Sequence, residues 1–191
     1  GSTKFDNVRN SDYDIESSYI QNCITQINES SMHFIGLHKS ISECSFKEEL
    51  HTLPAEHNRY HYLRFSIPDS FQKLSESTIE YDYSLGFSEK IGFRNSYGLP
   101  FKAFDPVNLR YYDFWEFPLL IMDSSLHYFM DKTADSDKLK YIEEFIKKNK
   151  YSTVISVLWH NDFFDSNSYG QLLQLIKRNT QVFALNKRRA D

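Results

Sequence analysis

The chain has 191 residues, 40% hydrophobic and 25% charged, a composition typical of a folded domain and not of a disordered one. The net charge of −4 provides no overall basic field for nucleic acid, and no stretch is long and apolar enough for a transmembrane helix. Two cysteines without CxxC spacing provide neither a disulfide framework nor a zinc-thiolate site. These features favour one domain over residues 1–191, in which residues 1–10 are a tag remnant and an irregular lead-in.

Hydrophobic periodicity predicts helices and strands that alternate along the chain. Apolar residues at helical spacing predict helices over residues 11–30, 45–53, 70–78, 135–150 and 168–179. Strands are predicted over 32–38, 60–67, 79–87, 115–123, 152–160 and 180–186, with a long loop over 88–113 that is marked by glycine and proline. This alternation predicts an α/β fold with a largely parallel sheet or barrel.

Ionisable side chains gather at the ends of the predicted strands. Such ends carry the active site in many α/β proteins, although a single histidine there is more often structural. The residues in question are His38, His61 with Arg64, Asp82 with Ser84, Glu116 with Asp123, and His160 at the end of "YSTVISVLWH". Taken together, they indicate an active site.

Several segments resemble motifs of the polysaccharide deacetylases, the NodB-homology or family-four carbohydrate esterases. "FIGLHKS" resembles their metal-binding segment, and "HYLRFSIPDSFQKLSESTIEYDYSLGF" resembles their third motif and the strand that follows it. "IGFRNSYGLPFKAFDP" and "DFWEFPLLIMD" are similar to segments of a bacterial subgroup, and "VLWHND" is similar to the last motif. The resemblance extends from about Ser11 to about Asn186 and depends on the order and spacing of short motifs.

The resemblance implies a deformed or incomplete (β/α) barrel that hydrolyses an N-acetyl or O-acetyl group on a carbohydrate substrate. It also implies a divalent metal, commonly zinc, with His38 as one ligand. By the same resemblance His160 is the general acid that protonates the leaving amine, and Arg64 orients the catalytic base. Leu158 and Trp159 would line the pocket for the acetyl methyl group.

Two departures from the family pattern bear on activity. Ser42 stands where the family has its second metal-binding histidine, so His61 is the candidate replacement ligand, with a structural role as the alternative. The first motif, which supplies two aspartates, has no convincing counterpart, because Asp6 in "KFDNVR" lies too close to His38 in the sequence. We therefore expect little or no deacetylase activity from this chain alone. Either the chain is a portion of a longer deacetylase, or it is a divergent relative that has lost catalysis. Exposed strand edges of an incomplete barrel would favour self-association.

Other interpretations remain open. A catalytically inactive domain that binds glycans would use aromatic side chains, which make up 16% of the chain. The base composition of an AT-rich genome also explains this aromatic content. A plain interaction domain would neither deacetylate nor bind a glycan. Glu116 and Asp123 are placed to bind sugar hydroxyls, or else to bond within the protein. Arg94, in a loop flanked by glycines, is a substrate anchor or pairs with a carboxylate such as Asp82.

Overall fold

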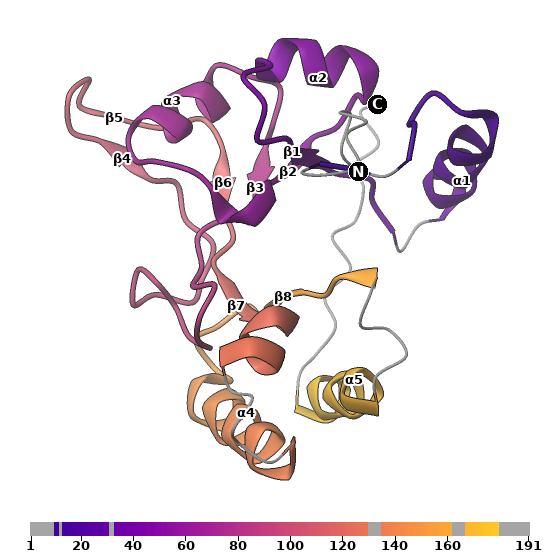
Figure 1. Cartoon of the computed structure of the whole chain (residues 1–191). Coiled ribbons are helices and arrows are strands. Elements are labelled where there is room, and N and C mark those ends of the chain that lie inside the picture. Colours follow the sequence, from indigo (N-terminus) through magenta and orange to yellow (C-terminus); the bar gives the residue numbers. More distant parts are fainter. Residues whose placement is uncertain (1–9, 12, 31–32, 130–134, 162–166, 180–191) are drawn as a thin grey trace. The chain divides into compact units, whose positions relative to one another are not determined.

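The computed structural model describes residues 10–11, 13–30, 33–129, 135–161 and 167–179 (Figure 1). The helices are α1 (Ser18–Glu29), η1 (His61–Leu63), α2 (Phe46–Thr52), α3 (Asp69–Ser75), η2 (Ser125–Phe129), α4 (Asp135–Asn149) and α5 (Asn167–Asn179). The strands are β1 (Leu37–Lys39), β2 (His57–Tyr60), β3 (Tyr81–Asp82), β4 (Phe104–Asp105), β5 (Arg110–Tyr111), β6 (Trp115–Glu116), β7 (Leu119–Met122) and β8 (Ser156–Leu158). The chain is therefore a mixed α/β protein.

The described residues divide into two compact units. Unit 1 contains residues within 10–84 and 101–116, and unit 2 contains residues within 85–100 and 117–179. The sequence indicates one domain, which stays a prediction, and each unit is described by itself.

Unit 1 is built on a four-stranded parallel sheet with the order β1-β2-β3-β6. Its register aligns Leu37, Asn58, Asp82 and Glu116 in one row across the four strands. Because side chains alternate along a strand, this row points to one face, and His38 points to the opposite face. The parallel arrangement brings the carboxyl ends of all four strands to one edge of the sheet.

Helices α2 and α3 cover the face that carries Leu37. Phe46 from α2 and Phe71 and Leu74 from α3 belong to the same buried cluster as Leu37 and Tyr60. Each large apolar side chain buried in this way contributes roughly 1.5–3 kcal/mol to folding. Helix α2 starts at a capping box, in which the Ser45 side chain accepts from the Glu48 amide and the Glu48 side chain accepts from the Ser45 amide.

Unit 2 has a two-stranded parallel sheet, β7 with β8, and helices α4 and α5. Every residue of β7 is buried, and its middle residues Leu120 and Ile121 pack in a cluster with Ile142 and Ile146 of α4 and Leu172 of α5. The inward face of α4 agrees with the periodicity of its sequence.

Most predicted elements are confirmed, but one predicted strand is split and another is misplaced. The strand predicted over residues 115–123 is split into β6 and β7, which belong to different sheets. The strand predicted over residues 60–67 is wrong, because β2 ends at Tyr60 and the chain turns at once into η1. Tyr62 and Leu63 in this turn have φ values of 54° and 50°, in the left-handed region, and a strand cannot pass through them. The strand predicted over residues 180–186 lies outside the described residues.

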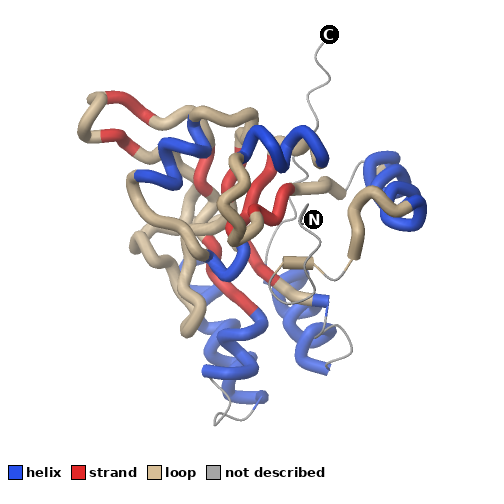
Figure 2. The backbone as a smooth tube through the Cα atoms, turned by 45° about the horizontal axis from the view of Figure 1, so that its top comes forward, coloured by secondary structure: helices blue, strands red, loops and turns tan. Residues whose placement is uncertain are grey.

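The α/β class is confirmed, whereas a barrel is not seen. The described strands form the four-stranded sheet, the pair β7–β8 and the antiparallel hairpin β4–β5, and none of these sheets closes on itself (Figure 2). No described helix is long and apolar enough to cross a lipid bilayer.

Candidate functional site

Two histidines meet at the strand ends of unit 1. His38 lies on β1, and His61 follows the last residue of β2 in a tight turn. Their ring centroids are 4.5 Å apart, with the rings tilted by 49°. The left-handed backbone of Tyr62, whose ring stacks on His61, holds this turn in an uncommon conformation. Strained backbone of this kind is concentrated at functional sites.

The tautomer of His38 follows from its hydrogen bond. His38 Nδ1 lies 3.1 Å from the carbonyl oxygen of Arg59, its partner in the sheet register. Because a carbonyl only accepts, Nδ1 carries the proton and Nε2 carries the lone pair. Burial, together with Coulombic repulsion from His61, lowers the pKa of His38 to about 3, so its ring is neutral at pH 7.

A neutral imidazole whose second nitrogen donates to a backbone carbonyl has the arrangement of a metal-binding histidine. His38 fits this requirement, and His61 lies against it as a second donor. Within the part of the chain that is described, however, no three His, Cys, Asp or Glu residues come together as a metal site. The described residues therefore bring two imidazoles together without a third ligand of these types.

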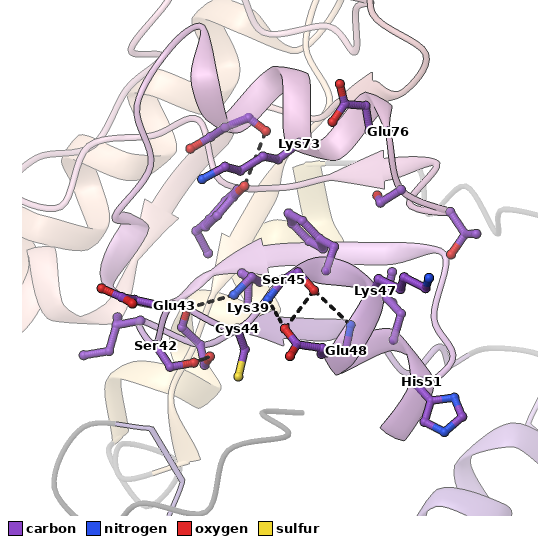
Figure 3. A pocket seen from close by; sticks show the side chains of 18 of the residues that line it. Lys39, Ser42, Glu43, Cys44, Ser45, Lys47, Glu48, His51, Lys73 and Glu76 are labelled. Carbon is purple, nitrogen blue, oxygen red and sulfur yellow. Dashed lines mark hydrogen bonds between the residues drawn. The ribbon is translucent and has the colours of Figure 1, made fainter.

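Arg64 lies directly after this turn, not on a strand as predicted. Its amide donates to the carbonyl of His61, and its exposed side chain lines a cleft of about 1500 Å³ in unit 1. The cleft lies between α2 and α3, with Lys47 and His51 on one side and Lys73 on the other (Figure 3). Glu43, Glu48 and Glu76 line the same cleft, and the role of Arg64 in orienting a catalytic base stays a prediction.

Glu116 belongs to a buried acid pair. Its side chain is hydrogen-bonded to that of Asp82, and both residues have no exposed surface. Asp82 also accepts from Asn58 Nδ2 at 2.6 Å and from the hydroxyl of Ser84 at 3.0 Å. Burial raises the pKa of Asp82, and these hydrogen bonds only partly oppose it. The sequence placed Glu116 on a substrate pocket wall, but its burial favours the alternative, in which it bonds within the protein.

Arg59 is a residue that sequence reasoning missed. Its Nε donates to the carbonyl of Tyr83 at 3.0 Å, and its guanidinium lies 5.8 Å from the centre of the Tyr83 ring. Burial lowers the pKa of Arg59, and the nearby carboxylates of Asp82 and Glu116 oppose this by favouring its charged form. The segment "HNRYHYLRF" contains both Arg59 and Arg64, and no motif in it distinguishes one from the other. Only the sheet register shows that Arg59 lies beside His38.

Unit 2 contains a histidine–aspartate pair. Asp123 follows β7 and His160 lies just beyond β8, and the parallel pairing of these strands brings the two residues together. His160 Nδ1 lies 2.7 Å from Asp123 Oδ1, and the His160 amide donates to Asp123 Oδ2. Burial alone would raise the pKa of Asp123, but the hydrogen bonds from His160 outweigh it, and the pKa is lowered. The carboxylate thus holds the imidazole in one orientation.

Of the other residues predicted for this site in unit 2, Leu158 and Trp159 directly precede His160 in the chain, and Arg94 does not. Leu158 ends β8 in register with Met122, and Trp159 is half-buried against the cluster of Leu120 and Ile121. Arg94 is exposed in a turn of a separate loop. The two roles considered for Arg94, substrate anchor or partner of a carboxylate, stay predictions.

Comparison with known proteins gives no identification: no protein-family model, no curated protein and no solved structure matches this chain.

Proposed function

We propose that this chain is a polysaccharide deacetylase-like domain, whose parallel strands belong to a deformed or incomplete (β/α) barrel. The observation that carries the proposal is His38, a neutral imidazole with its lone pair on Nε2, in contact with the ring of His61 at the strand ends. His38 and His61 would hold a divalent metal such as zinc together with a carboxylate from outside the described residues. When bound, such a metal polarises an acetyl oxygen and lowers the pKa of a water molecule.

The pair of His160 and Asp123 supports the same chemistry. A general acid needs a ring nitrogen with a defined proton, and the 2.7 Å contact from Nδ1 to Asp123 assigns one proton to Nδ1. The opposite nitrogen, Nε2, would donate the proton to the leaving amine. Asp123 acts as a positioning residue, because it favours the protonated imidazole and fixes the plane of the ring. Leu158 and Trp159, adjacent to His160, would contact the acetyl methyl group.

Calorimetric titration of the chain with zinc tests this proposal. We expect one zinc ion per chain, bound weakly because the described residues supply only two ligands, with affinity reduced about tenfold or more by His38→Ala and by His61→Ala. His51→Ala is the matched control, since His51 is exposed on α2. Absence of zinc binding, or binding that is indifferent to His38, would count against a deacetylase metal site.

A second candidate is an inactive domain that binds glycans. It is favoured by a row of rings on the His38 face of the sheet, where His57 stacks on Tyr81 with 4.9 Å between centroids. Trp115 shares the register row of these two residues and is exposed. Flat rings of this kind bind the C–H faces of sugars. This function predicts glycan affinity that survives EDTA and falls with Trp115→Ala, whereas deacetylase activity on acetylated chito-oligosaccharide that is abolished by His160→Ala would exclude it.

A further inference from the structure

The hairpin β4–β5 of unit 1 extends away from the four-stranded sheet (Figures 1 and 2). Its register pairs Phe104 with Tyr111 and Asp105 with Arg110. The buried Asp105 carboxylate organises the turn, accepting from the Val107 amide at 3.0 Å, the Asn108 amide at 3.2 Å and Asn108 Nδ2 at 2.7 Å. The tip is therefore a built turn with an internal anchor.

This tip presents apolar side chains where turns usually carry polar ones. Val107 is 80% exposed, Leu109 76%, Tyr111 66% and Phe104 50%. Leu109 has a φ of 52°, a left-handed conformation that favours glycine or asparagine over a branched side chain. A leucine kept exposed at such a position has a cost to folding and no packing that offsets it. This combination indicates that the side chain serves an interaction.

Charged side chains of both signs lie around the tip. The Asp105 carboxylate accepts hydrogen bonds within the turn and faces Arg110 across the hairpin, and Asp113 at the base of the hairpin pairs with Lys102 at 3.1 Å. Arg110, next to Leu109, is exposed. Lys102 lies 5.9 Å from the ring centre of Trp115, which is also exposed. The apolar tip is thus followed by aromatic and basic side chains.

We propose that this hairpin inserts its tip into the interface of an anionic lipid membrane. Aliphatic side chains at the point of a protrusion, followed by tyrosine, tryptophan and cations, match the order of environments from acyl chains to lipid headgroups. A protein partner is less well matched, because a stable complex buries about 800 Å² on each side and this tip is convex and formed by few side chains. The proposal is independent of the proposed deacetylase activity.

Vesicle co-sedimentation of the full chain tests the insertion. We expect binding to vesicles in which about a third of the phosphatidylcholine is replaced by phosphatidylglycerol, and weaker binding to phosphatidylcholine alone. The double variant Val107→Asp, Leu109→Asp should lower the bound fraction about tenfold or more. Arg110→Glu should weaken binding to the anionic vesicles only. Tyr151→Asp is the matched control, because Tyr151 is 90% exposed on unit 2, and it should bind as the wild type does.

Leu109→Gly separates an interaction role from a structural one. Glycine relieves the left-handed backbone, so the melting temperature should stay the same or rise while vesicle binding falls. A fall in both, equal binding by wild type and the double aspartate variant, or no vesicle binding at all would overturn the proposal. It would also be overturned if sedimentation velocity showed that the tip variants dissolve a dimer while vesicles stay unbound, since the tip would then bind a second copy of the chain.

Discussion

His160 Nδ1 and Asp123 Oδ1 lie 2.7 Å apart at the ends of the parallel strands β8 and β7. The contact joins residues 37 positions apart in the sequence, and the same carboxylate also accepts from the His160 amide. Asp123 is fully buried, while the His160 side chain is 40% exposed. The pair therefore combines a fixed carboxylate with an imidazole that solvent reaches.

Replacing Asp123 by asparagine tests how much this pair stabilises unit 2. We expect a loss of about 1 kcal/mol in the free energy of unfolding near pH 7, below the usual range for a charged hydrogen bond because His160 is partly exposed. The pKa of Asp123 is lower in the folded than in the unfolded chain, so its contribution is present above the unfolded pKa and disappears as the pH falls through the folded value. Urea unfolding at pH 7 and near pH 3 should show the difference and its loss. Equal losses at both pH values, or an equal loss in Asp113→Asn, which is exposed, would contradict this role.

The acid pair of Asp82 and Glu116 should give the opposite pH dependence. Burial raises the pKa of Asp82, so the wild-type chain loses stability as the pH rises from the unfolded pKa towards the folded one. Asp82→Asn has no such proton to lose. The difference in the free energy of unfolding between wild type and this variant, measured by urea unfolding, should therefore shrink as the pH rises above about 4. A gap that widens with pH would show that both carboxylates are stabilised in the charged form, and Glu43→Gln, on the surface, should give no such trend.

The buried ion pair of Lys39 and Glu49 offers a third test. Lys39 Nζ lies 2.6 Å from Glu49 Oε1, with both side chains almost completely buried. Lys39→Met leaves a buried carboxylate without its cation, and we expect a loss of about 3–5 kcal/mol in the free energy of unfolding. Adding Glu49→Leu should restore most of that loss, although the hydroxyl of Ser40 then loses its acceptor. No recovery in the double variant would mean that the loss of packing, and not the unpaired charge, causes the destabilisation. The control variant Lys47→Met, on the exposed face of α2, should leave the free energy of unfolding unchanged.

Replacing either of two glycines with alanine should change stability in opposite directions. A Cβ at Gly86 would lie 2.6 Å from Leu119 Cβ, so Gly86→Ala should destabilise unit 2 by roughly 1–3 kcal/mol through overpacking against β7. A Cβ at Gly170, in helix α5, would meet nothing within 4 Å. Gly170→Ala should stabilise by about 0.5–1 kcal/mol, as alanine does in helices. Thermal unfolding followed by circular dichroism measures both, and a shift of the same sign in the two variants would contradict the packing described for Gly86.

The sequence predicted helices better than sites. The apolar stripe of α4 and the capping box of α2 are local signals, and both helices are where they are expected. The strand placed over 60–67 failed because the turn at Tyr62 and Leu63 uses left-handed backbone without glycine, for which no residue type is diagnostic. Alternating residues such as those of "YHYLRFSI" satisfy a strand pattern even when the chain turns.

The candidate site was predictable only as separate residues. His38, His61, Asp123 and His160 are identified from the sequence at strand ends, but the contacts of His38 with the Arg59 carbonyl and of His160 with Asp123 are not. The carbonyl of Arg59 faces His38 because of the β1–β2 register, and Asp123 faces His160 because of the irregular β7–β8 register. Register depends on packing across the sheet, which a single sequence does not display.

The most direct measurement of the central claim is a long-range 1H–15N NMR spectrum of the histidine rings, recorded before and after addition of zinc. We predict that His38 shows the tautomer with the proton on Nδ1 and that zinc shifts the ring nitrogens of His38 and His61 together, while the exposed His51 stays unchanged. A His38 that is protonated on Nε2, or zinc shifts that bypass His38 and His61, would contradict the claim that these two rings form part of a metal site.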